Sequence, residues 1–317
     1  MARSPDELEL VCADFDSALD LLRGLGMRLD VVYPADDPHA AILTHDGLRL
    51  RLTSRPDAPP PPAGLPEFRP EFAVTHAGAA SGEGRAGMRY RDLIPGRLGG
   101  RYIASHITIP AGGPVADWVH FHRIALQLIC VRRGWVRVVY EDRGAPFVMA
   151  AGDMVVQPPG IRHRVLESSA GLEVVEISCP ACHETFADHE MALPNGAADP
   201  AREYEGQVFL HHVAAQAPWA PWHGAQAQAT AVAEATGGRA GARILRPGAA
   251  PAIAVPPHEG ELVFGFLLEG SARLEHGEVH PLGPADAFVI PPGAPWRLAG
   301  MSGDLRLLHV TTARLTP

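Results

Sequence analysis

The chain has 317 residues, of which 46% are apolar and 20% charged, so it is long enough for two domains and too apolar to be disordered. A formal net charge of −9 leaves no basic surface for the phosphates of a nucleic acid. No apolar run is long enough to span a bilayer, and the first residues lack the apolar stretch of a signal peptide. We therefore expect a cytoplasmic protein without nucleic-acid or membrane partners.

The N-terminal residues 1–54 predict a small α+β module of order βαβββ. We expect a strand over 7–12, a helix over 15–25, and strands over 27–33, 40–44 and 48–52. Asp14 is a suitable N-cap for the helix and Gly26 a suitable end. With Leu-Gly-Met-Arg-Leu after the helix, this order resembles one half of a glyoxalase-type (vicinal oxygen chelate) domain. Because such sites need two facing modules and one is visible, we expect a packing or dimerisation appendage.

The rest of the chain reads as short strands divided by Gly- and Pro-rich turns, which predicts a mainly β protein. Its expected parts are a linker and wrapping segment over 55–100, a β-dense block over 101–195, a bridge over 196–240 and a second β-dense block over 241–317. The two blocks share a strand ending in Gly and a Pro-Pro-Gly turn, found in Val156–Gly160 and in Val289–Gly293. Such an internal repeat predicts two copies of one barrel.

Three histidines of the first block have the spacing of a metal site. His120 and His122 stand two apart on a predicted strand and project from one face. The Pro-Pro-Gly turn brings the strand of His163 back toward that face. Three imidazoles leave coordination positions open, as catalytic metal sites do.

The motifs around these histidines resemble both motifs of the cupin superfamily. The matching positions are His120, His122, Gln127 and Gly134 in the first motif and Gly152, Pro158, Gly160 and His163 in the second. The resemblance implies two cupin (double-stranded β-helix, jelly-roll) barrels in tandem, a bicupin, and a homodimer. It also implies one divalent metal ion held by the three histidines and Gln127.

Gln127 stands where most metal-binding cupins carry Glu. An amide oxygen brings no charge, so the ion would keep its double positive charge and favour an anionic, bidentate small-molecule ligand. Some cupins acting on uronate sugars or in polyketide cyclisation are similar in having Gln there, and other cupin dioxygenases use three histidines alone. We expect Fe²⁺, with Zn²⁺, Ni²⁺ and Mn²⁺ as alternatives.

Two further residues are candidates for proton transfer. His106 lies on a preceding strand-like segment and could face the cavity, and Glu167 shares the face of His163 by the two-residue period of a strand. We expect either to act as a base or to orient a ligand. A satisfied core histidine and a rim salt bridge are the alternative interpretations.

The second block lacks the same ligands. Aligned on Gly270, it offers His258 but has Val263 and Trp296 at two of the other ligand positions. We expect a barrel without metal, either structural or enclosing an apolar pocket.

The four cysteines, Cys12, Cys130, Cys179 and Cys182, are expected as free thiols in a reducing compartment. Cys179 to His183 matches the C-x-x-C-H pattern of haem attachment. An inert loop, a redox pair or an additional metal site suits a strand end in such a chain better than haem does.

Three functions follow from these observations. The first is a metal-dependent dioxygenase acting on a small keto-enol or phenolic compound. The second is a non-redox isomerase, cyclase or lyase acting on a sugar acid or other carbonyl compound. The third is a non-catalytic small-molecule-binding cupin.

Overall fold

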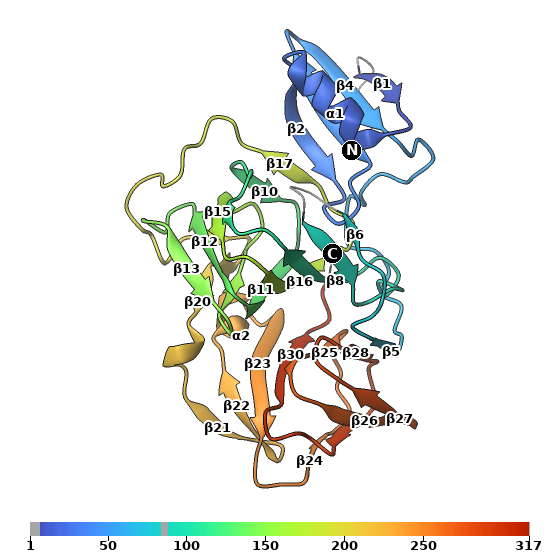
Figure 1. Ribbon diagram of the computed structural model, residues 1–317, viewed down its shortest axis with the longest axis vertical. Helices are drawn as coiled ribbons and strands as arrows, with labels where there is room; N and C mark the ends of the chain where they lie inside the picture. The colour runs from blue at the N-terminus through green and yellow to red at the C-terminus, as the bar shows by residue number, and fades with distance from the viewer. Residues whose placement is uncertain (1–6, 84–87, 317) are drawn as a thin grey trace.

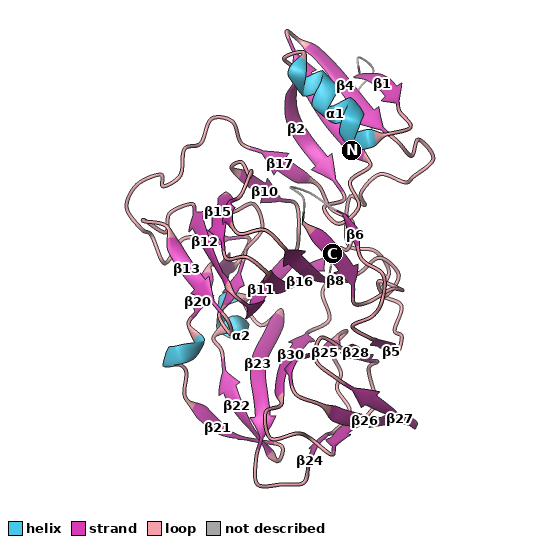
Figure 2. Ribbon diagram, in the orientation of Figure 1, coloured by secondary structure: helices cyan, strands magenta, loops and turns pink. Residues whose placement is uncertain are grey.

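The computed structural model describes residues 7–83 and 88–316, and most of its regular structure is β-strand (Figures 1 and 2). A small N-terminal module is followed by two β-barrels, which confirms the mainly β fold with tandem barrels (Figure 1). Within the described ranges, no helix is both long and apolar enough to cross a membrane. Residues 1–6, where the predicted module begins, lie outside the described residues.

The N-terminal module has the predicted βαβββ order. Its elements are β1 (Glu7–Val11), α1 (Phe15–Gly24), β2 (Arg28–Tyr33), β3 (Ala40–His45) and β4 (Leu48–Thr53). Asp14 caps α1, because its Oδ1 accepts a hydrogen bond from the Ser17 backbone N–H at 3.1 Å. Phe15 of the helix packs on Leu43 and Leu52 of the sheet, which forms the small core of the module. The sheet does not end at β2, because β17 (Thr185–Ala187) continues it into the first barrel.

The first barrel is built from two facing sheets. One sheet continues from β17 in the order β17-β10-β15-β12-β13, and β9 pairs with β15. The other sheet has the order β20-β14-β11-β16-β8-β7-β6. The strands are β6 (Gly82–Glu83), β7 (Arg89–Asp92), β8 (Ile103–Ile109), β9 (Gly113–Pro114), β10 (His120–His122), β11 (Leu126–Arg133), β12 (Trp135–Tyr140), β13 (Phe147–Ala150), β14 (Met154–Val156), β15 (His163–Ser168), β16 (Leu172–Cys179) and β20 (Leu210–His212).

The second barrel repeats this design with the sheets β21-β22-β23-β30-β25-β28-β5 and β24-β29-β26-β27. The strands are β5 (Ala73–Thr75), β21 (Trp219–Trp222), β22 (Ala225–Ala229), β23 (Ala240–Pro247), β24 (Ala252–Val255), β25 (Val263–Glu269), β26 (Ala272–His276), β27 (Glu278–Leu282), β28 (Ala287–Ile290), β29 (Trp296–Ala299) and β30 (Arg306–Thr312). Between the barrels lie the hairpin β18 (Glu203–Tyr204) and β19 (Gln207–Val208), a 3-10 turn (Ala214–Gln216) and α2 (Val232–Ala235).

The connecting segments join the two barrels. The predicted wrapping segment gives β5 to the second barrel and β6 and β7 to the first. The predicted bridge gives β20 to the first barrel and β21 and β22 to the second. One hydrophobic cluster contains side chains of both barrels, among them Leu128, Val175, Phe264 and Val310. The barrels therefore share a core.

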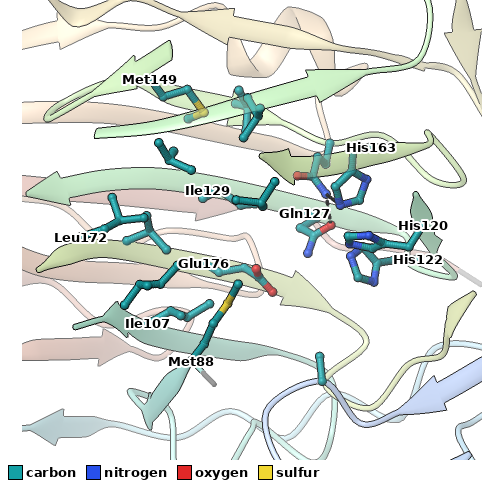
Figure 3. A pocket seen from close by; sticks show the side chains of 18 of the residues that line it. Met88, Ile107, His120, His122, Gln127, Ile129, Met149, His163, Leu172 and Glu176 are labelled. Atoms are coloured by element: carbon teal, nitrogen blue, oxygen red, sulfur yellow. Dashed lines mark hydrogen bonds between the residues drawn. The ribbon is translucent and has the colours of Figure 1, made fainter. Parts of the chain in front are cut away.

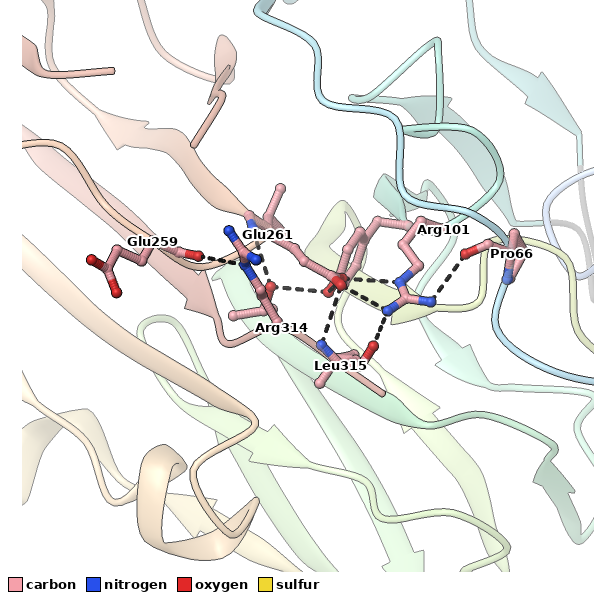
Figure 4. Close-up of polar contacts among 9 residues, drawn as sticks. Pro66, Arg101, Glu259, Glu261, Arg314 and Leu315 are labelled. Carbon is pink, nitrogen blue, oxygen red and sulfur yellow. Dashed lines mark hydrogen bonds and ion pairs between the residues drawn. The ribbon is translucent and has the colours of Figure 1, made fainter. Parts of the chain in front are cut away.

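A buried ion pair crosses the same interface (Figure 4). The Arg101 guanidinium donates to both carboxylate oxygens of Glu261 at 2.9 and 2.7 Å, and the two side chains are only 5% and 7% exposed. The Tyr102 hydroxyl donates to Glu261 at 2.8 Å, and Arg101 also donates to the carbonyls of Pro66 and Leu315. This network connects the linker, the first barrel and the C-terminal segment.

Candidate metal centre

The interior of the first barrel holds a cavity of about 90 Å³ (Figure 3). A single water molecule needs about 10–15 Å³ by this measure, so the cavity accepts several waters or one small organic molecule. Its walls carry aliphatic side chains from the surrounding strands, among them Ile107, Ile129, Val138, Met149, Val165 and Leu172. Its polar groups are the three predicted histidines, Gln127, Gln157, Tyr140, Glu176 and Tyr90.

The structure brings the three predicted histidines together. His120 of β10 lies directly opposite His163 of β15 in the antiparallel ladder, and their ring centroids are 4.1 Å apart. His122, two residues further on β10, projects from the same face. One ligand atom from each ring lies within 4.8 Å of the other two. Over the described part of the chain, these are the only three His, Cys, Asp or Glu side chains gathered closely enough to hold a metal ion.

Each histidine is oriented through Nδ1. His120 donates from Nδ1 to the Trp118 carbonyl at 2.7 Å, and His163 to the Ile161 carbonyl at 3.1 Å. A carbonyl can only accept, so both rings carry a proton on Nδ1 and have Nε2 as their acceptor nitrogen. His122 Nδ1 lies 3.0 Å from the Thr185 hydroxyl, which can accept from this nitrogen or donate to it. Metal-binding histidines are held in this way, so the donor set fits a divalent ion.

Gln127 lies beside the triad on β11 and is itself held in place. The Gln157 amide N–H donates to Gln127 Oε1 at 2.8 Å, and the same nitrogen lies 3.2 Å from His163 Nε2. Tyr140 fixes the orientation of Gln157, because its hydroxyl donates to Gln157 Oε1 at 2.6 Å. Burial raises the pKa of Tyr140, so this hydroxyl stays a donor. An amide oxygen has two lone pairs, so Gln127 can bind a metal ion and keep its bond to Gln157.

Glu176 is a cavity residue that sequence reasoning missed. It lies on β16 opposite Ile129 of β11, and its carboxylate points into the cavity on the side of the histidines (Figure 3). The Ser178 hydroxyl donates to it at 3.3 Å. The sequence did hold a signal, since Glu176 takes an inward position in the alternation of Leu172, Val174 and Ser178.

The structure places His106 outside the cavity. Its neighbour Ile107 lines the cavity, so His106 projects from the opposite face of β8, toward the second barrel. There its Nε2 lies 2.8 Å from Glu173 and its Nδ1 accepts from Arg91 at 3.1 Å. Burial and the Arg91 charge lower the pKa of His106. This placement does not support the catalytic role predicted for it.

Glu167 also lies away from the cavity, for a reason that regular alternation concealed. A bulge shifts the register of β15 against β12, so that Val165 pairs with Val138 while Glu167 pairs with Arg137. One extra residue turns the following side chains to the other face of the strand. Glu167 is consequently 38% exposed and pairs with Arg137 at 3.3 Å. The rim salt bridge, weighed as the alternative, is what the structure contains.

The cysteines carry no chemistry that the geometry supports. All four are free, as predicted. Burial raises the pKa of Cys179 to about 12 and that of Cys182 to about 11. The thiolate is the form that attacks disulfides and binds metals, so the inert-loop interpretation of this segment fits best.

The second barrel fills the corresponding space with side chains. By the repeat alignment, Val263 and Trp296 replace Gln127 and His163, and Trp296 is buried. Gly265 stands where Ile129 stands in the first barrel, and the Phe288 ring occupies the space beside it so closely that an added Cβ would overlap the ring. The one group of three possible ligands among the described residues lies in the first barrel.

We expect Gly265→Ala to destabilise the second barrel by about 1–3 kcal/mol, because the new methyl group must displace the buried Phe288 ring. Urea denaturation of the single variants and of Gly265→Ala with Phe288→Leu measures this. The double variant should be more stable than the sum of the two single losses implies. Strict additivity would show that the close packing of this pair does not matter.

Comparisons with solved structures find a similar architecture in several proteins. A putative glyoxylate-induced protein from Pseudomonas aeruginosa superimposes with a TM-score of 0.57 at 13% identity, over 81% of this chain and 94% of that chain. Oxalate decarboxylase from Bacillus subtilis matches with a TM-score of 0.55 at 10% identity, over 81% of each chain. Protein Ylba from E. coli matches with a TM-score of 0.54 at 11% identity, over 80% of this chain and 96% of that chain.

At these identities the likeness is one of fold. The chain therefore shares the bicupin-like fold of these proteins, which is the fold that its motifs predicted. No family model matches the sequence, and no curated protein matches it either. The likeness of the N-terminal module to a glyoxalase-type domain stays a prediction.

Proposed function

We propose that this protein is a metal-dependent oxygenase acting on a small keto-enol or phenolic compound, with the ion held by His120, His122, His163 and Gln127. The observation that carries the proposal is the convergence of three oriented histidines on a largely apolar cavity. Four side-chain ligands still leave positions of a six-coordinate ion open for a small molecule. When bound, Fe²⁺ would supply electron transfer to oxygen, whereas Zn²⁺, Ni²⁺ or Mn²⁺ would supply Lewis-acid chemistry.

The charge of the ligand set supports a chelating, oxygen-bearing substrate. Three imidazoles and an amide are neutral, so the ion would keep its full positive charge. A bidentate ligand with one ionised oxygen, such as an enolate or a phenolate, is attracted most strongly by such a centre.

The cavity walls favour a compound with an apolar body. A sugar acid carries several hydroxyl groups, and each would lose its water partners against walls of isoleucine, valine and leucine. An unsatisfied hydroxyl costs about 1–3 kcal/mol by mutational measurements, so several together would outweigh the binding of one acid group. Flat phenolic rings and short diketones bury apolar surface there instead.

Glu176 sets a second requirement. It is the one carboxylate among the described residues that line the cavity, and a fully ionised ligand next to it would be repelled. A ligand that presents an O–H group beside its chelating oxygen would donate a hydrogen bond to this carboxylate. A catechol that has lost one proton still has such a group, whereas a keto-enol has it only until it ionises. A carboxylate in this place also favours the second candidate function, a non-redox isomerase or lyase, because that chemistry moves protons.

Metal analysis and oxygen uptake test the proposal together. The protein, purified without a metal-affinity column, is reconstituted with Fe²⁺ or Zn²⁺ and mixed with acetylacetone or catechol while dissolved oxygen is followed. We expect oxygen consumption only with iron. Turnover with zinc and without oxygen uptake would replace the proposal by the non-redox alternative. Tight metal binding without any turnover would favour a non-catalytic binding protein. We expect the protein to be a homodimer whichever of these functions it has.

We expect Glu176→Leu to reduce the preference for catechol over its methyl ether guaiacol by about 10–100-fold, because hydrogen bonds to charged groups contribute about 1.5–3 kcal/mol. Guaiacol chelates the metal ion less well than catechol does, and this loss is the same in the wild type and in Glu176→Leu. The difference between the two proteins in the ratio of catechol affinity to guaiacol affinity therefore measures the contact with Glu176. Isothermal titration of the Zn²⁺-loaded proteins measures it. Glu167→Leu, on the outer face of the same barrel, is the matched control, and an equal ratio in both variants would remove Glu176 from the site.

A further inference from the structure

The strand β17 links the N-terminal module directly to the metal ligands. On one side β17 pairs with β2 of the module, where Thr185 lies opposite Val32. On the other side it pairs with β10, where Thr185 lies opposite His122. A continuous ladder of backbone hydrogen bonds thus runs from the module to a predicted ligand (Figure 1).

Thr185 also acts through its side chain. It is fully buried, and its hydroxyl lies 3.0 Å from Nδ1 of His122. The position of this hydroxyl depends on the backbone of β17, which is held between β2 and β10. The module therefore determines where the hydrogen-bond partner of His122 lies.

Trp118 provides an independent connection to His120. Its carbonyl accepts the Nδ1 hydrogen bond of His120 at 2.7 Å. Its indole packs against the hydrophobic core of the module, which contains Phe15, Leu29 and Val32. One residue therefore has its backbone at the metal site and its side chain in the module.

The module reaches the cavity itself through the loop between β2 and β3. Ala35 in this loop is one of the residues that line the cavity. The next residue, Asp36, is held by an ion pair with Arg97 at 2.6 Å. In a further contact with the module, His189 Nε2 donates a hydrogen bond of 2.7 Å to the carbonyl of Leu29 in β2.

We propose that the N-terminal module, residues 7–53, is a positioning element of the metal centre, which orients His120 through Trp118 and His122 through Thr185. This inference rests on the metal site of the proposed function. It gives the module a role beyond packing or dimerisation, since two of the three histidine ligands have outer partners that contact the module. Thr185 and Trp118 are positioning residues, because they touch the ligands and not the reacting molecule.

The test uses Co²⁺ as the probe metal, with its visible absorption spectrum and its affinity, measured by competition with a chromophoric chelator, as readouts. We expect Thr185→Val, which keeps the shape and removes the hydroxyl, to weaken Co²⁺ binding about 10–100-fold and to alter the spectrum, as loss of an outer-shell partner does. Thr185→Ser, which keeps a hydroxyl at this position, should have the Co²⁺ affinity and the spectrum of the wild type. Wild-type affinity and spectrum in Thr185→Val would overturn the role of Thr185.

A variant within the module tests the coupling without replacing either histidine partner. Leu29→Ala removes buried packing in the module, and Leu274→Ala removes it in the second barrel. We expect only Leu29→Ala to weaken Co²⁺ binding when both lose similar stability in urea. Equal Co²⁺ affinity in the two variants would overturn the inference. A wild-type protein that binds Co²⁺ no better than His122→Ala would instead refute the metal site, so the two failures are distinguishable.

Discussion

Replacing His122 with alanine is expected to abolish stoichiometric metal binding. His122 is one of three imidazoles whose ligand atoms lie within 4.8 Å of one another, and its Nδ1 is already engaged by Thr185. With two histidines and an amide left, the affinity should fall by more than the roughly 10–100-fold that loss of an outer-shell partner costs. Elemental analysis after reconstitution, together with chelator competition, measures the change.

His258→Ala is the matched control for this experiment. His258 is the one histidine of the second barrel that aligns with the first motif, and its Nε2 lies 3.1 Å from the Ile290 carbonyl. We expect this variant to keep one metal ion per chain. If His122→Ala retains its metal, the ion binds elsewhere and the assignment of the site is wrong.

Replacing Glu261 with glutamine is expected to cause the largest loss of stability, about 3–5 kcal/mol. The change removes one partner of a buried ion pair and leaves the Arg101 charge without its counterion inside the protein. Urea denaturation monitored by fluorescence measures the free energy of unfolding. The effect is large because burial removes the water that would otherwise solvate Arg101.

The exposed pair of Arg297 and Glu275 provides the comparison. These side chains are 43% and 35% exposed, so Glu275→Gln should cost no more than about 1 kcal/mol. Replacing Arg101 by Met and Glu261 by Leu together should recover much of the loss, because no unpaired charge then remains. Equal losses in Glu261→Gln and Glu275→Gln would contradict the interpretation of Figure 4 as a buried stabilising pair.

The predicted metal ligands were accessible from the sequence because their geometry is local. His120 and His122 share a face by strand alternation, and the Pro-Pro-Gly turn positions His163 on the neighbouring strand. Gln127 follows from the same motif. The capped helix α1 and the strands of the module were predictable for the same reason, since caps and alternation extend over a few residues.

The alternation of inward and outward side chains along a strand gave wrong placements in two situations. In one the backbone departs from regular alternation, and in the other the sequence does not show which face of the strand is the inner one. The bulge in β15 turned Glu167 outward, and nothing in the local sequence marks that bulge. For His106 the alternation was regular, but the sequence does not say which face of β8 is the inner one.

The sequence alone determined the tandem barrels, the three histidines with Gln127, and the absence of matching ligands in the second barrel, because each depends on spacing within a strand or turn. Only the tertiary structure decided which distant strands meet. It brought Gln157 to Gln127, Glu176 into the cavity, and the module to His122 through β17. These pairings depend on sheet register between segments far apart in the chain, which local spacing does not encode.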